Sequence, residues 1–181
     1  MAADPGNDWQ PRLAGRLLAM RPVESSDFDA LLAVGSDPEV WAVHPDRERW
    51  RPERFRAYFD GGLACGKALV AVDQATGAVI GWSRYSNEAT GPGEIEIGWT
   101  FLGRPYWGGA YNGEMKQLML AHAFGFVDRV LLRIGETNLR SRRAAEKIGA
   151  RLLADRPAPA PAGQTVPYLF YAIEKADFLA G

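Results

Sequence analysis

The feature that most constrains this chain is a glycine-containing turn, RPYWGGAYN at Arg104–Asn112, between a strand-like and a helix-like segment. The strand-like run is Glu94–Phe101 (EIEIGWTF), and the apolar helical pattern spans Met115–Phe126. Backbone N–H groups at a helix start converge on anions, and the helix dipole adds positive potential. Gly108 and Gly109 have no Cβ to keep a phosphate from the main chain. The pattern therefore predicts either a pyrophosphate-binding turn or an ordinary tight turn.

The same turn differs from two common nucleotide-binding motifs. It lacks the Lys-Ser/Thr ending of a P-loop and the full GxGxxG spacing of a dinucleotide fold. If it binds an anion, we expect a pyrophosphate-bearing ligand other than ATP or NAD.

Periodicity and turn residues divide the rest of the chain into alternating strands and helices. The hairpin signal is the clearest, with β-rich runs at Ala68–Asp73 and Ala78–Tyr85 around a short turn that ends in Gly77. We expect further strands at 16–21, 94–101, 130–134 and 166–173, helices at 26–34, 52–59, 115–126 and 138–148, and a loop at 152–163. Gly61 and Gly62 are expected to end the second helix. The chain thus forms one α/β domain, residues 12–181, after a disordered segment at 1–11.

Charge and cysteine content exclude several classes of partner. The net charge is −1, which argues against nucleic acid and anionic membranes. The single cysteine, Cys65, excludes an intrachain disulfide and favours a reducing cytoplasm. There is no export signal, no membrane-spanning run and no histidine cluster at metal-ligand spacing.

A second candidate anion site follows the strand at 130–134. Asn138–Arg143 (NLRSRR) begins a helix and offers an amide, a hydroxyl and three guanidinium groups. Because ligands bind near the carboxyl ends of such strands, the two helix starts should lie close together. They suit a ligand with a pyrophosphate and a further phosphate. Coenzyme A has both.

Three segments resemble the GNAT acyltransferases, specifically the ribosomal-protein N-terminal acetyltransferases and their relatives. They are EIGWTF at 96–101, YWGGAYNGE at 106–114 and NLRSRRAAEKIGA at 138–150, in the family's order and spacing. The resemblance spans roughly Arg16 to Ile173. It implies a single-domain α+β fold with a mixed sheet of about seven strands and helices on both faces. It also implies transfer of an acetyl group from acetyl-CoA, as cosubstrate, to a primary amine of a small molecule or a protein N-terminus. A homodimer remains open.

The resemblance also assigns cofactor contacts to particular residues. It implies that the pantetheine arm pairs with main-chain groups of Trp99, Thr100, Phe101 and Leu102. The pyrophosphate would bind the amides of Trp107, Gly108, Gly109, Ala110, Tyr111 and Asn112. Asn138 would bond the pantetheine or the incoming amine, Ser141 would lie near the thioester sulfur, and Arg142 or Arg143 would reach the outer phosphate.

The sequence also departs from the family. Gly109 stands where a basic residue is usual, so one phosphate contact is missing, and Ala110 replaces a glycine. Ala145 stands where many members have a general-acid tyrosine, which excludes that mechanism here. The missing tyrosine is the argument for an alternative function, a sensor that binds acyl-CoA without turnover.

Two residues are candidates for proton transfer. Glu94 and Glu96 alternate with apolar residues and share one strand face, so Glu96 is either a general base or part of a solvated face. Ser141 is either a proton donor to the departing thiolate or a helix cap and cofactor ligand. His44 is either a substrate contact or a surface residue.

Overall fold

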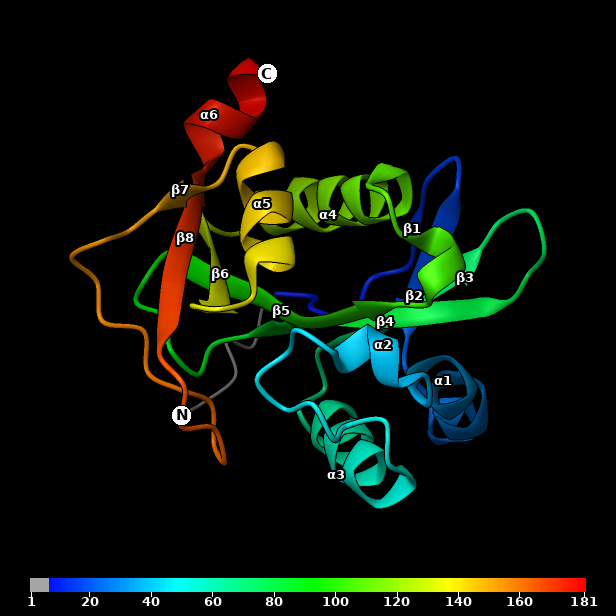
Figure 1. Ribbon diagram of the computed structural model, residues 1–181. Coiled ribbons are helices and arrows are strands. Elements are labelled where there is room, and N and C mark those ends of the chain that lie inside the picture. Colours follow the sequence, from blue (N-terminus) through cyan, green and yellow to red (C-terminus); the bar gives the residue numbers. More distant parts are fainter. Residues whose placement is uncertain (1–6) are drawn as a thin grey trace.

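The computed structural model describes residues 7–181, and its centre is an eight-stranded sheet with the order β1-β2-β3-β4-β5-β6-β8-β7 (Figure 1). Only β5 and β6 pair in parallel among these strands, as a βαβ crossover requires. The strands are β1 Leu13–Ala14, β2 Leu18–Pro22, β3 Ala68–Asp73, β4 Val79–Ser86, β5 Glu94–Leu102, β6 Arg129–Gly135, β7 Arg151–Leu152 and β8 Tyr168–Glu174.

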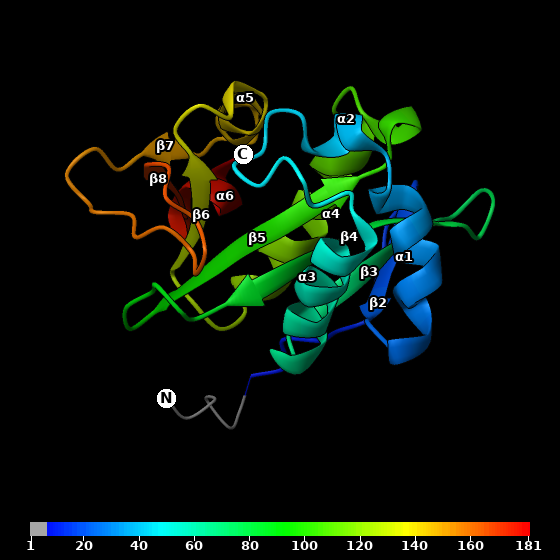
Figure 2. The ribbon, with the colours of Figure 1, turned by 60° about the horizontal axis from the view of Figure 1, so that its bottom comes forward.

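Helices cover both faces of this sheet. The α-helices are α1 Phe28–Gly35, α2 Pro38–Trp41, α3 Pro52–Ala64, α4 Ala110–Ala123, α5 Leu139–Lys147 and α6 Lys175–Ala180, and the 3-10 turns are Ser25–Asp27 and Arg104–Tyr106. Figures 1 and 2 show α1 and α3 on one face and α4 and α5 on the other. Side chains along β4 alternate between the two faces of the sheet, so each face has its own hydrophobic core. Trp82 packs with the α1–α3 layer, and Tyr85 packs with the α4 layer. No helix among residues 7–181 has the length and apolar character to cross a membrane.

The expected mixed sheet with helices on both faces is confirmed, with eight strands in place of about seven. β1 and β7 have two residues each, too short to produce an alternating pattern in the sequence. The hairpin of β3 and β4, the strand β5 and the helices α4 and α5 lie where the sequence placed them. The helix α6 was not predicted.

The end expected for the second predicted helix, at 52–59, was wrong; this helix is α3 in the structure. α3 continues through Gly61 and Gly62 to Ala64. A Cβ added to Gly62 would lie 2.2 Å from the Trp82 ring, so this glycine lets the helix pack closely on β4. A packing requirement therefore accounts for Gly62, where the sequence suggested a helix stop.

Part of the expected disordered segment contacts the core. Residues 1–6 lie outside the described residues, so the prediction is untested there. Trp9 is 7% exposed, and its ring centroid lies 4.9 Å from that of Tyr85. Gln10 donates a side-chain hydrogen bond to the carbonyl of Ala68 at 3.1 Å.

One carboxylate attaches α4 to the edge of the sheet. Glu114 accepts hydrogen bonds from the N–H groups of Arg16, Leu17 and Leu18 at 2.9, 2.7 and 2.9 Å. These contacts hold the first turns of α4, and the glycine turn before them, in place beside the sheet.

The strands β5 and β6 separate after a short paired stretch. Their pairing runs from Glu94↔Arg129 to Glu96↔Leu131, although β5 continues to Leu102 and β6 to Gly135. Near this point the register of β4 and β5 shifts, and Trp99 adopts a φ of +51°. Because this bulge bends β5, the two strands part and leave a gap at their carboxyl ends.

The adjacent glycines of α3 give a matched test of this packing. We expect Gly62→Ala to lower the free energy of unfolding by about 1–3 kcal/mol, because the new methyl group meets Trp82. Gly61→Ala meets nothing within 4 Å and should raise it by about 0.5–1 kcal/mol, as a helical Gly→Ala change does. Denaturant unfolding of both variants measures the difference. Equal effects would contradict the assigned role of Gly62.

Candidate active site

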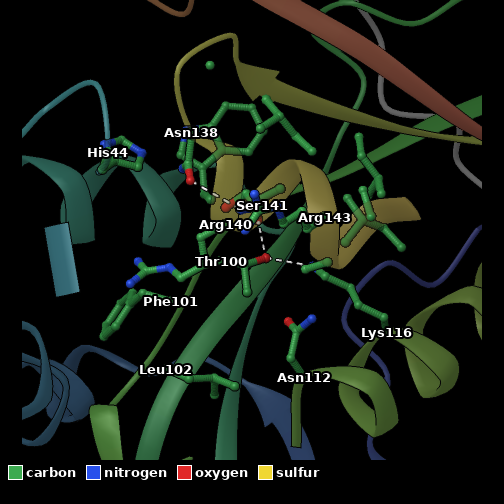
Figure 3. Close-up of a pocket in the computed structure, with 18 of the residues that line it drawn as sticks. His44, Thr100, Phe101, Leu102, Asn112, Lys116, Asn138, Arg140, Ser141 and Arg143 are labelled. Atoms are coloured by element: carbon green, nitrogen blue, oxygen red, sulfur yellow. Dashed lines mark hydrogen bonds between the residues drawn. The ribbon is translucent and has the colours of Figure 1, made fainter. Parts of the chain in front are cut away.

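A cavity of about 410 Å³ occupies the gap between β5 and β6 (Figure 3). Its walls come from the separated parts of both strands, the glycine turn and the first turns of α4 and α5. The segment after α2 contributes His44 and Pro45 on another side. Residues far apart in the sequence thus enclose one chamber.

The glycine turn has the conformation that its composition requires. Gly108 and Gly109 have φ values of +104° and +110°, in the region that favours glycine. Gly109 is the N-cap of α4, whose first N–H groups have no partner within the helix. A Cβ on Gly109 would lie 2.9 Å from the Nζ atom of Lys147. Lys147 therefore places a positive charge over the turn, where the sequence seemed to lack one.

The start of α5 forms the opposite wall. Asn138 is the N-cap, and its Oδ1 accepts a hydrogen bond from the Ser141 N–H at 3.2 Å (Figure 3). Asn138 and Ser141 both line the cavity, as does Arg143. The Arg140 guanidinium stacks over the exposed Trp107 ring at 4.1 Å from its centroid, which links this helix to the glycine turn.

The charged side chains that line the cavity are all basic. Five basic side chains line it, and no carboxylate does among the described lining residues. They are Lys116, Arg133, Arg140, Arg143 and Lys147. With two helix N-termini directed at the same space, the electrostatic potential favours a polyanionic ligand.

Most of the cofactor-binding residues predicted from sequence line this cavity. They are Trp99, Thr100, Phe101, Leu102, Trp107, Gly108, Gly109, Asn112, Asn138, Ser141 and Arg143.

The structure places three others, Ala110, Tyr111 and Arg142, outside the lining. The Tyr111 hydroxyl donates to Asp73 at 2.9 Å. The Arg142 Nε donates to the Tyr171 hydroxyl at 3.0 Å, and its Nη1 donates to the Glu136 carbonyl. Successive residues of a helix point about 100° apart, so Arg142 and Arg143 cannot share one direction.

Glu96 lies behind the cavity wall. It is 2% exposed, so its interpretation as part of a solvated strand face was wrong. Its Oε1 accepts a hydrogen bond from Arg133 Nε at 3.1 Å, while its Oε2 has no hydrogen-bond partner among the described residues. Burial raises the pKa of Glu96 to about 7, against the opposing effect of Arg133.

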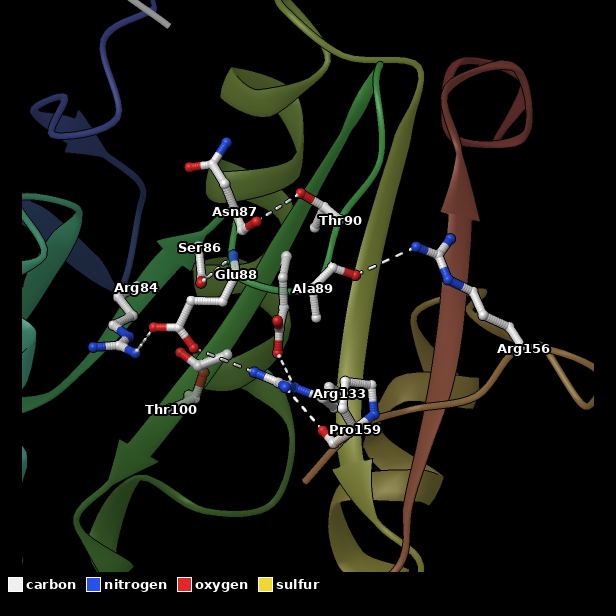
Figure 4. Close-up of polar contacts among 12 residues, drawn as sticks. Arg84, Ser86, Asn87, Glu88, Ala89, Thr90, Thr100, Arg133, Arg156 and Pro159 are labelled. Atoms are coloured by element: carbon white, nitrogen blue, oxygen red, sulfur yellow. Dashed lines mark hydrogen bonds and ion pairs between the residues drawn. The ribbon is translucent and has the colours of Figure 1, made fainter. Parts of the chain in front are cut away.

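Charged residues from β4, the loop after it and β6 act on Glu96, and Figure 4 shows these three, Arg84, Glu88 and Arg133. Glu88, on the loop after β4, reaches Arg84 at 3.5 Å and Arg133 at 3.7 Å. The Arg84 guanidinium lies over the Trp99 ring, 3.6 Å from its centroid. Glu94 points away to Arg156, which is the largest cause of the fall in its pKa to about 2.

Sequence reasoning missed several lining residues. Lys116 sits three residues before the buried Met119, on the apolar face of α4, and this misplaced charge was a signal that could have been used. Lys147 and Arg140 come from the helix already suspected, but their direction depended on packing. His44 was not missed: it was expected to be either a substrate contact or a surface residue, and it lines the cavity half-buried. Burial lowers its pKa to about 3, so the ring is neutral at physiological pH.

Comparison with known proteins gives this arrangement a family. The family model described as "Acetyltransferase (GNAT) domain" matches residues 17–151, so the chain belongs to the GNAT acetyltransferases. It is thus an acyl-CoA N-acyltransferase by family and fold. No protein of curated function matches the sequence.

Solved structures share the fold at low identity. A GCN5-related N-acetyltransferase from Brucella melitensis is 20% identical with a TM-score of 0.81, over 94% of this chain and 81% of that one. A GNAT-family acetyltransferase from Bacillus anthracis is 23% identical with a TM-score of 0.74, over 92% and 99%. A spermidine N-acetyltransferase from Vibrio cholerae, in complex with CoA and spermine, is 12% identical with a TM-score of 0.67, over 90% and 98%.

Of the two glutamates of β5, only Glu96 should make the stability depend on pH near neutrality. The folded-state pKa of Glu96 lies above its ordinary value of 4.5, so its contribution to stability is lost as pH rises toward about 7. Relative to Glu96→Gln, the wild type should lose on the order of 1–3 kcal/mol of unfolding free energy between about pH 5 and about pH 8. Denaturant titrations at several pH values measure this.

Glu94→Gln is the matched control. Because the pKa of Glu94 is lowered to about 2, this group is ionised in both folded and unfolded states over the same range. Its stability difference from wild type should stay constant with pH. A constant difference for Glu96→Gln as well would contradict the raised pKa.

Proposed function

We propose that this protein binds acetyl-CoA in the cavity and transfers its acetyl group to a primary amine by direct attack in a ternary complex. One observation carries the proposal. Five basic side chains and two helix N-termini surround a gap between diverging parallel strands, with no carboxylate among the described lining residues. A polyanion with a long uncharged arm, such as CoA, satisfies both the charge and the shape of this site.

Each part of CoA has a matching group of residues. The amides that follow Gly108 would bind the pyrophosphate, with Lys147 supplying the charge that Gly109 lacks. Arg143 would bind the outer phosphate. The main chain of Trp99–Leu102, no longer paired with β6, would bond the pantetheine arm between the strands. Ser141 would contact the cofactor near its thioester.

The reaction needs a base, an oxyanion donor and a proton for the leaving thiolate. Glu96 would accept the proton of the amine through water, since its Oε2 is unpartnered and its pKa is near neutrality. Backbone N–H groups of β5 beside the thioester would stabilise the tetrahedral oxyanion. The amine would enter beside Trp41, His44 and Tyr168, which line the side of the cavity away from the glycine turn.

The acceptor is a primary amine of a small molecule or of a protein N-terminus. Two observations support these classes: the resemblance of three motifs to ribosomal-protein N-terminal acetyltransferases, and the fold shared with a spermidine N-acetyltransferase. We infer a cytoplasmic location from the single, unpaired Cys65. We expect neither nucleic acid nor membrane as a partner, and a homodimer remains open.

The glycine turn can be tested without any acceptor. Gly108→Val should weaken CoA binding at least tenfold, because a branched side chain blocks the backbone from the pyrophosphate. Isothermal titration calorimetry with CoA, and with ATP for comparison, measures the affinity. Gly66→Val is the matched control, because Gly66 also has a positive φ (+64°) and open space but lies outside the cavity. Unchanged CoA affinity in folded Gly108→Val would count against the site.

Turnover is tested by thiol release from acetyl-CoA with a panel of amines. The panel contains spermidine, free amino acids, an aminoglycoside and peptides with free N-termini. We expect at least one acceptor to be acetylated, and Glu96→Gln to lower kcat about 100-fold or more. Wild-type kcat should fall below about pH 7, where Glu96 is protonated, and the variant should lack this pH dependence. CoA binding without turnover of any acceptor would instead support an acyl-CoA sensor.

A further inference from the structure

Lys116 is a buried cation without a counter-ion. It is 7% exposed and lines the cavity from α4. Its Nζ donates to Thr100 Oγ1 at 2.7 Å and to Ser83 Oγ at 3.4 Å. No carboxylate contacts it among the described residues. Lysines are rarely buried unless they are paired with an opposite charge, because burying an unpaired charge costs free energy. A structural role alone therefore does not explain why Lys116 is buried.

Lys116 lies in the cavity beside Thr100 of β5. Figure 3 shows its side chain reaching from α4 to the Thr100 hydroxyl on β5, between Asn112 and the Ser141–Arg143 turn of α5. Thr100 belongs to the strand segment that we assign to the pantetheine arm. The hydroxyls of Ser83 and Thr100, themselves 2.7 Å apart, hold the ammonium group at this place.

We propose that Lys116 is the proton donor to the departing CoA thiolate. This inference rests on the proposed function. The amine nitrogen attacks the thioester carbon, the carbon–sulfur bond breaks, and its electron pair goes to sulfur. Sulfur then takes a proton from Lys116 Nζ, giving free CoA and a neutral lysine. Solvent returns a proton to Lys116, while the proton lost by the acceptor amine resides on Glu96 until it too reaches solvent.

The surrounding groups make this lysine a ready donor. Burial lowers the pKa of Lys116 to about 7, and this value suits proton transfer near neutral pH. The groups that face it are the hydroxyls of Ser83 from β4 and Thr100 from β5 and, across the cavity on α5, the cations Arg143 and Lys147. Burial alone accounts for the lowered pKa of Lys116, and no acidic partner among the described residues opposes it.

Other residues lining the cavity fit the role less well. His44, whose pKa is lowered to about 3, has no ionisable proton to give near neutral pH. Burial raises the pKa of Tyr168, and arginine side chains keep their protons. Glu96 has the complementary property, because its pKa is raised to about 7 on the opposite face of β5. The pKa of Glu96 is raised toward neutral pH and the pKa of Lys116 is lowered toward it, so the two groups form an acid and base pair.

Two variants separate proton donation from charge and packing. Lys116→Met keeps the length of the side chain and removes the proton, while Lys116→Arg keeps the charge but cannot release a proton. We expect both to lower kcat/KM for acetyl-CoA about 100-fold or more. Wild-type kcat/KM should fall above about pH 7 as Lys116 loses its proton, and both variants should lack this fall. Because Lys116 is also one of the basic side chains of the cavity, calorimetry measures the CoA affinity of each variant, and the donor role predicts a loss of kcat at saturating acetyl-CoA beyond any loss of affinity.

Lys147→Met is the matched control, because it removes the other lysine of the cavity. It should weaken CoA binding and leave the fall of kcat/KM above about pH 7 in place. NMR of lysines labelled at Cε gives a readout apart from activity, with one resonance that titrates near pH 7 in wild type and is absent from Lys116→Met.

The outcomes distinguish the two proposals. If wild type acetylates an amine but Lys116→Arg keeps the wild-type rate, or the high-pH fall persists in Lys116→Met, the donor role is overturned and the acetyltransferase proposal stands. If wild type binds no CoA or acetylates no amine, the proposed function itself fails.

Discussion

The separation of β5 from β6 is the constraint on which the rest of the site depends. Backbone hydrogen-bonding groups that leave a sheet must find other partners. Beyond Glu96, β5 has β4 on one side and the cavity on the other, so its free edge can bond an extended ligand arm. The bulge near Trp99 produces this separation, and the helices α4 and α5 begin on either side of it. One backbone irregularity thus brings together the gap between the strands and the two helix starts that we propose as anion sites.

Electrostatics divides the site into two regions with opposite properties. At the mouth, exposed Arg143 and Lys147 and the helix starts create a field for phosphates at little desolvation cost. Deeper in the fold, burial dominates over charge. Glu96 retains an ion pair with Arg133 and Lys116 has only hydroxyl partners, yet desolvation moves the pKa of both toward neutrality. The cavity therefore has a positive region at one end, suited to the phosphates of the proposed cofactor, and groups suited to proton transfer at the other.

The candidate site was predictable wherever backbone conformation decides the chemistry. Gly108 and Gly109 have positive φ values and Asn138 caps α5, so local sequence located the turn and the helix start that line the cavity, while anion binding there stays a prediction. Side-chain direction was not predictable in the same way. Arg142 and Arg143 look equivalent in sequence, but one turns to Tyr171 and the other to the cavity. A rotation of about 100° around the helix axis separates their directions, and only packing fixes which of them faces the cavity.

By itself, the sequence determined the order of the longer strands and helices, the glycine turn and the family, because these depend on short-range periodicity, turn chemistry and motif spacing, whereas the short elements β1, β7 and α6 gave no such signal. Tertiary structure alone decided which groups are removed from water. Glu96 suits a solvated strand and Lys116 an exposed helix turn by residue type, yet each is buried beside the gap in the sheet. The physical reason is that desolvation depends on every neighbour brought together by the fold, and those neighbours come from segments far apart in the chain.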